Sequence, residues 1–163
     1  FLKAPLNFSR ISSGFSHSRM HPILNVRRPH HGIDYAAAAG TPVRAIGKGR
    51  IVKRTYGKGT GNFIKIKHNS SYVSGYMHLQ SFAKDLHYGS KVEQGEIIGY
   101  VGSTGMSTGP HLDFRMWKDG RPINHRNLDL PSVEPIKKAS QKAFEKIRKE
   151  YLQKLNQINP LPV

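Results

Sequence analysis

The sequence predicts an all-β domain of antiparallel sheets, followed by a single C-terminal α-helix. Apolar and polar side chains alternate with a period of two through several short segments, which is typical of half-buried strands. Glycine-containing turns separate these segments, and after Pro131 the apolar period changes to three and four residues. We therefore expect one domain over residues 1–131 and an amphipathic helical tail over residues 132–163.

Six segments have the composition of strands, namely residues 41–45, 49–56, 62–68, 72–78, 97–101 and 112–117. The turn at 56–61 is rich in glycine, and Asp119-Gly120 lies at the centre of a second tight turn, so both joins favour hairpins. Two longer loops, at residues 16–29 and 103–109, are expected to wall a groove. Gly, Ser and Thr in the second loop would let a peptide backbone approach, although ordinary turn chemistry explains the same composition.

The C-terminal tail carries an apolar stripe at helical spacing. The stripe consists of Val133, Ile136, Ser140, Phe144, Ile147, Tyr151 and Leu155, while lysines and glutamates fill the other faces. Ser132 is the expected start of the helix, and Pro160 prevents its continuation. We expect the stripe to pack on the β domain or on a neighbouring chain. A basic helix that lies on a membrane surface is the alternative.

The chain is strongly basic, with a formal net charge of +16. The basic residues are dispersed, and no helix-turn-helix, zinc-finger or RNA-motif signature accompanies them, so nucleic acid is not the expected partner. An anionic polymer of the cell envelope accounts for the same charge, and a generically basic surface is the alternative. The absence of cysteine excludes a thiolate zinc site, and no apolar run is long enough to span a membrane.

Histidines and carboxylates at regular spacings carry the most chemical information. His111 and Asp113 are separated by one residue in a segment with apolar alternate positions, so both project from one strand face. Two such neighbours lie roughly 7 Å apart, so one can bind a metal while the other contacts a substrate. In residues 72–78 the same alternation places Tyr76 with His78 and sets Met77 on the opposite face. His78 is therefore expected to point into the same groove.

Each of these residues also has a simpler explanation. Nine histidines in one chain place some of them near carboxylates by chance. Surface or hydrogen-bonded structural roles are expected for His17, His68, His87 and His125. An alternative for Asp113 is an exposed strand carboxylate that balances Arg115. The pair His30 and Asp34 is a weak pattern alone, but glycine, a tight apolar segment and Gly-Thr-Pro follow it directly.

Several ordered segments together resemble the lysostaphin-type, or LytM-type, zinc endopeptidases that cut peptidoglycan peptides. The resemblance extends from about Leu6 to Leu130 and covers most of the chain. It rests on Ser12-Ser13-Gly14-Phe15, Arg19-Met20-His21-Pro22, His30-x-Gly32-x-Asp34, Gly40-Thr41-Pro42-Val43, Tyr76-Met77-His78-Leu79, and residues 95–102 and 107–114.

The resemblance implies that His30 and Asp34 are two ligands of a catalytic zinc, and that His78 and His111 are the two non-ligand catalytic histidines. The family's remaining ligand is the second histidine of a His-x-His motif, and Asp113 occupies that place here. A carboxylate binds zinc at nearly the same distance as imidazole, so Asp113 is expected to be the third ligand. Two aspartates would make the ion a weaker Lewis acid, and the oxygen-rich set would also suit manganese or another divalent ion.

The function that the resemblance implies is hydrolysis of peptide cross-links in bacterial peptidoglycan, with direct D-Ala-to-diaminopimelate links favoured over glycine bridges. The alternative is a catalytically silent LytM-type domain that binds and activates a cell-wall amidase. A single replacement by another ligand type favours the enzyme. We expect a periplasmic or extracellular location, with a targeting segment upstream of Phe1.

Overall fold

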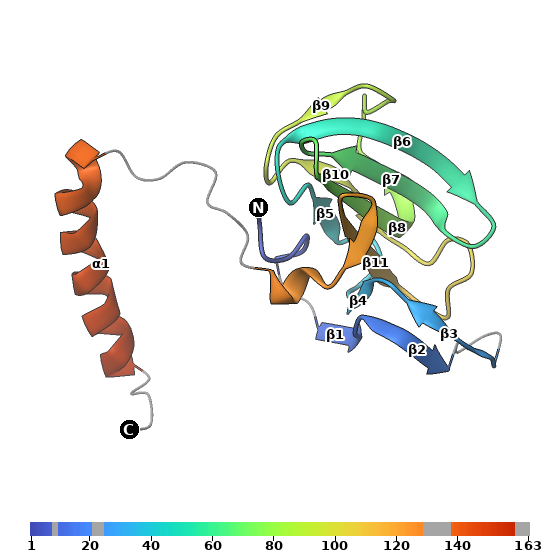
Figure 1. Ribbon diagram of the computed structural model, residues 1–163, viewed down its shortest axis with the longest axis horizontal. Coiled ribbons are helices and arrows are strands. Elements are labelled where there is room, and N and C mark those ends of the chain that lie inside the picture. Colours follow the sequence, from blue (N-terminus) through green and yellow to red (C-terminus); the bar gives the residue numbers. More distant parts are fainter. Residues whose placement is uncertain (8–9, 21–24, 129–137, 159–163) are drawn as a thin grey trace. The chain divides into compact units, whose positions relative to one another are not determined.

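The computed structural model describes residues 1–7, 10–20, 25–128 and 138–158 (Figure 1). The chain divides into two compact units, Phe1–Leu130 and Pro131–Val163. Unit 1 holds all of the described strands, and unit 2 holds α1 (Lys138–Ile158). The strands are β1 (Arg10–Ser13), β2 (Ser16–Met20), β3 (Arg27–His30), β4 (Ile33–Ala36), β5 (Pro42–Arg44), β6 (Gly49–Gly57), β7 (Gly61–Lys67), β8 (Tyr72–Phe82), β9 (Lys91–Val92), β10 (Ile97–Val101), β11 (His111–Lys118) and β12 (Arg121–Ile123).

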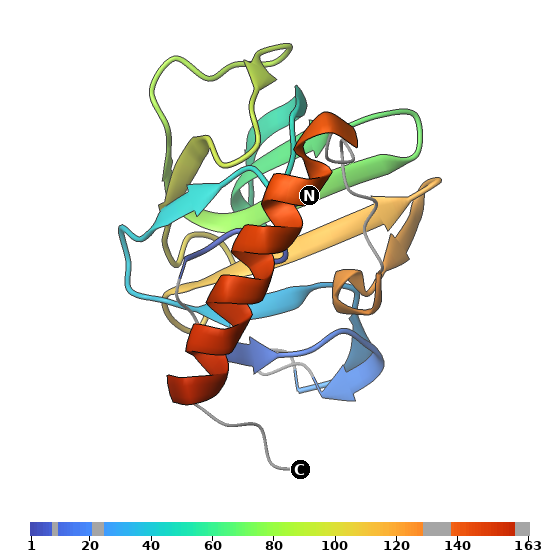
Figure 2. The ribbon, with the colours of Figure 1, turned by 90° about the vertical axis from the view of Figure 1, so that its left-hand side faces the viewer.

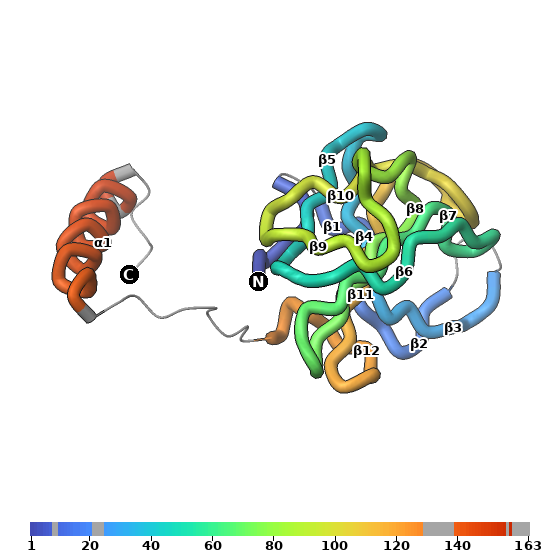
Figure 3. Tube along the Cα trace, turned by 90° about the horizontal axis from the view of Figure 1, so that it is seen from above, coloured from blue at the N-terminus to red at the C-terminus, as the bar shows by residue number. Residues whose placement is uncertain are grey.

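Unit 1 is built on one large antiparallel sheet. Its main path runs β1-β4-β11-β8-β7-β6-β9, while β10 pairs with β5 and β8, and β12 pairs with β11. Figure 2 shows β8, β11 and β4 next to one another in green, orange and blue. A separate hairpin of β2 and β3 lies on the side of β4, as Figure 3 shows. The predicted all-β class with a C-terminal helix is confirmed.

All six predicted strands are present, as β5, β6, β7, β8, β10 and β11. The prediction ended β8 too early, because the strand continues to Phe82. Residues 16–29 are not simply a loop: they contain β2 and most of β3, which pair with each other. These two strands are largely exposed, so no alternation of apolar residues marks them in the sequence. The loop at 103–109 contains no regular strand or helix, as predicted.

The hydrophobic core lies against one face of the large sheet. Leu112, Phe114 and Met116 are fully buried, as the alternation in β11 predicts, and they pack with residues of β4, β7, β8 and β10. The Tyr76 hydroxyl accepts hydrogen bonds from the backbone N–H of Ile46 and from the Ser74 hydroxyl, both at 3.0 Å. Because the apolar side chains of β11 fill the core face, its other side chains, including His111 and Asp113, lie on the opposite face.

Helix α1 spans most of the predicted tail. Two ion pairs at helical spacing support it, between Glu145 and Arg148 at 3.2 Å and between Glu150 and Lys154 at 2.8 Å. The predicted start at Ser132 and the first two members of the apolar stripe lie outside the described residues. Packing of the stripe on the β domain or on a neighbouring chain stays a prediction. Within the described part of the chain, no helix is long and apolar enough to cross a membrane.

His125 is buried behind the sheet, with 5% of its surface exposed. Its Nε2 lies 2.9 Å from the Tyr35 hydroxyl, and its ring packs edge-on against Phe114 at 4.7 Å between centroids. Burial, with a smaller contribution from Arg126, lowers the pKa of His125 from 6.5 to about 4. The structural role predicted for this histidine is confirmed.

The pKa of His125 has a consequence for stability in acid. A histidine with a lowered pKa in the folded protein is protonated first in the unfolded chain, so stability is lost as the pH falls from about 6.5 toward 4. The loss from this group is about 3 kcal/mol at most. We expect His125→Asn to lose less free energy of unfolding than the wild type across this pH range, measured by urea denaturation. His87→Asn, at an exposed position, should keep the wild-type slope, and parallel curves for His125→Asn and wild type would contradict the assignment.

Candidate active site

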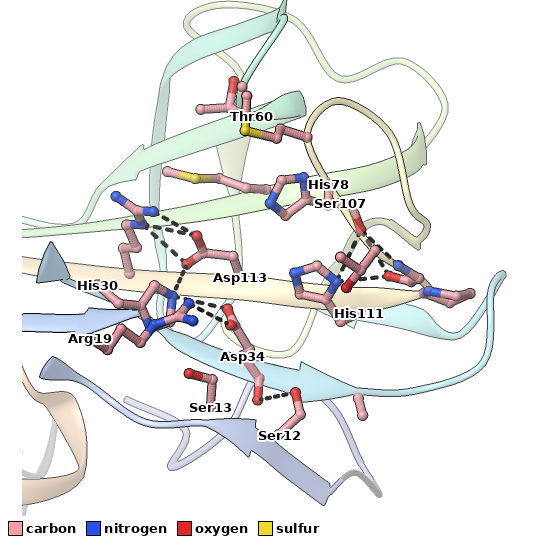
Figure 4. Close-up of a pocket in the computed structure, with 18 of the residues that line it drawn as sticks. Ser12, Ser13, Arg19, His30, Asp34, Thr60, His78, Ser107, His111 and Asp113 are labelled. Atoms are coloured by element: carbon pink, nitrogen blue, oxygen red, sulfur yellow. Dashed lines mark hydrogen bonds and ion pairs between the residues drawn. The ribbon is translucent and has the colours of Figure 1, made fainter. Parts of the chain in front are cut away.

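A groove of about 680 Å³ opens on the polar face of β4, β8 and β11. The β2–β3 hairpin and residues 106–110 line it on different sides, so both predicted wall segments contribute. The five predicted site residues all line this groove: His30, Asp34, His78, His111 and Asp113 (Figure 4). None of the four histidines expected to have other roles is among its described lining residues.

Two carboxylates face each other at the centre of the groove. In the antiparallel register of β4 and β11, Asp34 lies directly opposite Asp113. Like charges at directly opposed positions repel, so the pair needs a cation. His30, at the end of β3, brings its Nε2 to 3.1 Å from Asp34 Oδ1 and 3.8 Å from Asp113 Oδ1. One ligand atom from each of the three residues lies within 4.8 Å of the others.

The hydrogen bonding of His30 suits a metal ligand. Its Nδ1 lies 3.0 Å from the carbonyl oxygen of Gly14, which can only accept, so Nδ1 carries the hydrogen and Nε2 faces the carboxylates. Burial alone would lower the pKa of His30, but Asp113 and Asp34 outweigh it and raise the pKa to about 9. Asp34 Oδ1 is buried without a hydrogen-bond partner among the described residues, and it lies 3.1 Å from His30 Nε2.

These three residues fit a divalent cation. One imidazole nitrogen and two carboxylates are the donor types that zinc accepts in proteins, and a fourth position remains for water or substrate. An unpartnered buried carboxylate oxygen that faces an imidazole nitrogen is the position that such an ion would satisfy. The donors come from β3, β4 and β11, which the sheet and the hairpin hold in fixed relation.

Asp113 is also held from the other side. Arg115 Nε donates to both of its oxygens, at 3.1 Å and 3.2 Å, and Arg115 Nη2 donates to Oδ2 at 2.7 Å. Burial would raise the pKa of Asp113, but His30 and Arg115 hold it well below its usual range. The alternative of an exposed carboxylate is wrong, because Asp113 is only 4% exposed. Its pairing with Arg115 nevertheless occurs, and it takes place inside the groove.

His78 reaches the groove by a different route from the one predicted. Met77 lies opposite Asp113 and lines the groove, whereas Tyr76 points into the core. Strict alternation would therefore direct His78 into the core with Tyr76. Instead, β8 contains one extra residue relative to β7 at this point, and His78 adopts a φ of 60°. The bulge rotates the side chain to the groove face.

Backbone carbonyls orient both histidines that were predicted to be catalytic. His78 Nδ1 lies 2.8 Å from the Thr104 carbonyl oxygen, and His111 Nδ1 lies 2.8 Å from that of Gly109. Both Nδ1 atoms therefore carry hydrogen, which leaves Nε2 as the acceptor nitrogen of each neutral ring. Burial lowers the pKa of His78, so this ring is neutral at neutral pH. The two ring centroids are 4.8 Å apart.

One supporting residue, Thr104, was missed in the sequence, and Arg115 was expected only as an exposed partner of Asp113. Thr104 holds His78 through its carbonyl, and its hydroxyl donates to the Leu79 carbonyl at 2.7 Å. No local pattern marks this residue, because its partners are about 25 residues away. Arg115 had a visible signal, since it lies two residues after Asp113 on the same strand face.

Gly32 provides the space for the Asp113–Arg115 pair. A Cβ atom at this position would overlap with Asp113 Oδ1 and would lie 2.9 Å from Arg115 Cγ. The backbone oxygen of Phe114, at 3.2 Å, closes the same space. Any larger residue must therefore displace the carboxylate, the guanidinium or the strand.

The comparisons with known proteins identify the family of the chain. The family model described as peptidase family M23 matches residues 28–125, and the chain belongs to this family. The peptidoglycan DD-endopeptidase ShyC of Vibrio cholerae is 36% identical over 161 residues, which are 99% of this chain and 37% of that protein. DD-carboxypeptidase/endopeptidase Mpg of Neisseria meningitidis is 42% identical over 98% of this chain and 36% of its own length. The chain thus spans little more than a third of these relatives.

Solved structures give the same result for the fold. A zinc-containing peptidase from Vibrio cholerae superposes with a TM-score of 0.74 at 35% identity, over 80% of this chain and 40% of that one. The catalytic domain of lysostaphin from Staphylococcus simulans superposes with a TM-score of 0.62 at 31% identity, over 71% of this chain and 88% of that one. The predicted resemblance to lysostaphin-type peptidases is confirmed.

The tight space at Gly32 predicts a large effect on stability. Gly32→Ala should lower the free energy of unfolding by about 1–3 kcal/mol, because the added methyl overpacks the buried ion pair. Gly109→Ala is the matched control, since a Cβ there meets nothing within 4 Å, and it should stay within about 1 kcal/mol of wild type. Urea denaturation measures both changes. Equal stability of the two variants would show that the pair does not depend on Gly32.

Proposed function

We propose that this domain is a zinc-dependent endopeptidase that hydrolyses peptide cross-links of bacterial peptidoglycan in the cell envelope. The observation that carries the proposal is the cluster of His30 with two opposed carboxylates, beside two oriented histidines in one groove. Membership of peptidase family M23 and the names of the peptidoglycan DD-endopeptidases that it resembles support the reaction and the substrate class.

In this proposal His30, Asp34 and Asp113 hold the ion, and a different divalent ion is the alternative to Zn²⁺. A bound divalent ion supplies Lewis acidity, which polarises a peptide carbonyl and makes water more acidic. The chain positions the two carboxylates by strand register and the imidazole by its bond to Gly14. The strand register and this hydrogen bond therefore set the positions of the proposed ligand atoms.

His78 and His111 supply the proton transfers. An imidazole that is neutral and presents Nε2 can take a proton from the attacking water and return it to the leaving amine. The lowered pKa of His78 keeps this ring ready to accept a proton at neutral pH. Either ring, once protonated, also stabilises the oxygen that becomes negative during attack. The bulge at His78 is what brings the two rings together over the same part of the groove.

The charge of the protein supports an anionic polymer as substrate. Arg19 and Arg28 lie opposite each other in the β2–β3 hairpin, and both line the groove. Such opposed cations attract carboxylates, which peptidoglycan stem peptides carry. Direct D-Ala-to-diaminopimelate cross-links remain the favoured bond, and the envelope remains the expected location.

The ligand assignment predicts the metal content of the protein. Protein prepared without chelator and supplied with zinc should contain about one equivalent of metal. His30→Ala and Asp34→Asn should each lose it, whereas exposed His87→Ala should retain it. Elemental analysis measures the content, and anomalous scattering places the ion. Metal that persists in both ligand variants would exclude this site.

The catalytic assignment makes a separate prediction. His78→Ala and His111→Ala should each reduce hydrolysis of cross-linked muropeptides by about a hundredfold or more, the usual contribution of a general acid–base group. Both variants should keep their metal, and His87→Ala should keep its activity. Loss of metal in His111→Ala would make that residue a ligand.

One result would reverse the functional conclusion. A wild-type domain that binds metal, cleaves no muropeptide and stimulates a cell-wall amidase would be a regulator rather than an enzyme.

A further inference from the structure

The carboxylate of Asp113 contacts two basic side chains, His30 and Arg115. Its Oδ1 faces His30 Nε2 at 3.8 Å, on the side where the ion is proposed. Its Oδ2 faces away and receives the shortest hydrogen bond of the group, at 2.7 Å from Arg115 Nη2. Nε of the same guanidinium donates to both oxygens, at 3.1 Å and 3.2 Å, so Oδ2 receives two bonds from Arg115, whereas Oδ1 receives one and also faces His30. Figure 4 shows Asp113 next to His30 and Asp34 in the groove.

The guanidinium changes the charge of the site. Asp34 and Asp113 alone would cancel the formal charge of a divalent ion and weaken it as a Lewis acid. Arginine is charged at every relevant pH, so Asp113 and Arg115 together are neutral, as an imidazole ligand is. Arg19 makes only one contact with Asp34, at 3.4 Å, from a side chain that is 27% exposed, and it compensates much less. The weaker Lewis acidity that was expected from two aspartates did not take the charge of Arg115 into account.

The protein makes specific room for this pair. Gly32 has no side chain at the point where a Cβ would meet both Asp113 and Arg115. Arg115 itself is held in the sheet, in register with Gly75 of β8, so its direction toward Asp113 is fixed by its place on the strand. Lys65 of β7 pairs with the same glycine from the other side and contacts Trp117 instead. Arg115 and Lys65 therefore flank Gly75 on neighbouring strands, but only Arg115 contacts Asp113.

Resting on the proposed metal-dependent function, we propose that Asp113 and Arg115 form one functional unit that replaces a neutral ligand. Arg115 is a positioning residue: its two bonds to Oδ2, the shorter at 2.7 Å, keep that oxygen from the ion, so that Asp113 presents Oδ1 to it, and the guanidinium balances the carboxylate charge. Neither residue suits the site without the other. An isolated aspartate would neutralise the ion, and an isolated arginine would repel it.

The test is a double-mutant cycle on zinc affinity, measured by competition with a chromogenic chelator. In the wild-type background, Arg115→Met should weaken zinc binding by about 10–100-fold, because Asp113 loses its orienting partner. Asp113→His should also weaken binding, because it leaves the guanidinium unpaired beside the ion. In that background, adding Arg115→Met should strengthen binding by about tenfold or more. Lys65→Met removes a positive charge from the other side of Gly75, and it should leave zinc affinity unchanged in both the wild-type and the Asp113→His backgrounds.

A spectroscopic measurement tests the positioning role directly. Four-coordinate Co²⁺ absorbs visible light more strongly than five- or six-coordinate Co²⁺. Arg115→Met should free Oδ2 to bind and lower the absorbance of the cobalt-loaded domain, whereas Lys65→Met should leave the spectrum unchanged. An unchanged spectrum in Arg115→Met would overturn the single-oxygen assignment.

The outcomes separate this inference from the proposed function. If Arg115→Met changes zinc affinity in the same direction in the wild-type and Asp113→His backgrounds, the paired unit is overturned. It is also overturned if Arg115→Met changes zinc affinity in neither background. In both cases the metal site itself stands. Absence of zinc binding in the wild type overturns the metal site itself. If Arg115→Met alone does not fold, the comparison of Asp113→His with Asp113→His/Arg115→Met decides the question, because both variants lack the buried carboxylate that Arg115 contacts.

Discussion

The direct opposition of Asp34 and Asp113 across β4 and β11 is the constraint on which the groove depends. Two carboxylates held at neighbouring positions of a buried sheet surface repel each other unless positive charge is close. The chain supplies that charge on several sides, through His30 between the carboxylates and Arg115 behind Asp113. A divalent ion fits the same gap. The two proposed carboxylate ligands are brought together by this one strand register.

The three groove histidines share a single structural device. In each ring Nδ1 is bound to a backbone carbonyl, from Gly14 for His30, and from Thr104 and Gly109 for the other two. Backbone carbonyls of a packed β domain are fixed, so each ring is held in one tautomer and one orientation. In the proposed function, the same bond prepares one imidazole to bind a cation and two imidazoles to accept protons. Their positions on different strands decide which role each can have.

The fold class, the six longer strands and the groove-facing pair in β11 could all be predicted from the sequence. These features are recorded locally, because a period of two in apolar residues directly reports which face of a strand is buried. The nearness of the two segments that carry His30 and Asp113 came only from the resemblance to a family. Composition alone contains no information on which strands pair. The short strands β1 to β4 left no pattern, since they are brief or largely exposed.

By itself the sequence determined an all-β domain with a helical tail and a set of residues with the chemistry of a metal site. Only the tertiary structure decided how that set works. His78 turns to the groove because β8 bulges against β7, and Asp113 is neutralised because the sheet aims Arg115 at it. Both depend on pairing between distant strands and on one backbone torsion. Neither the strand pairing nor the backbone torsion can be read from the spacing of residues along a single segment.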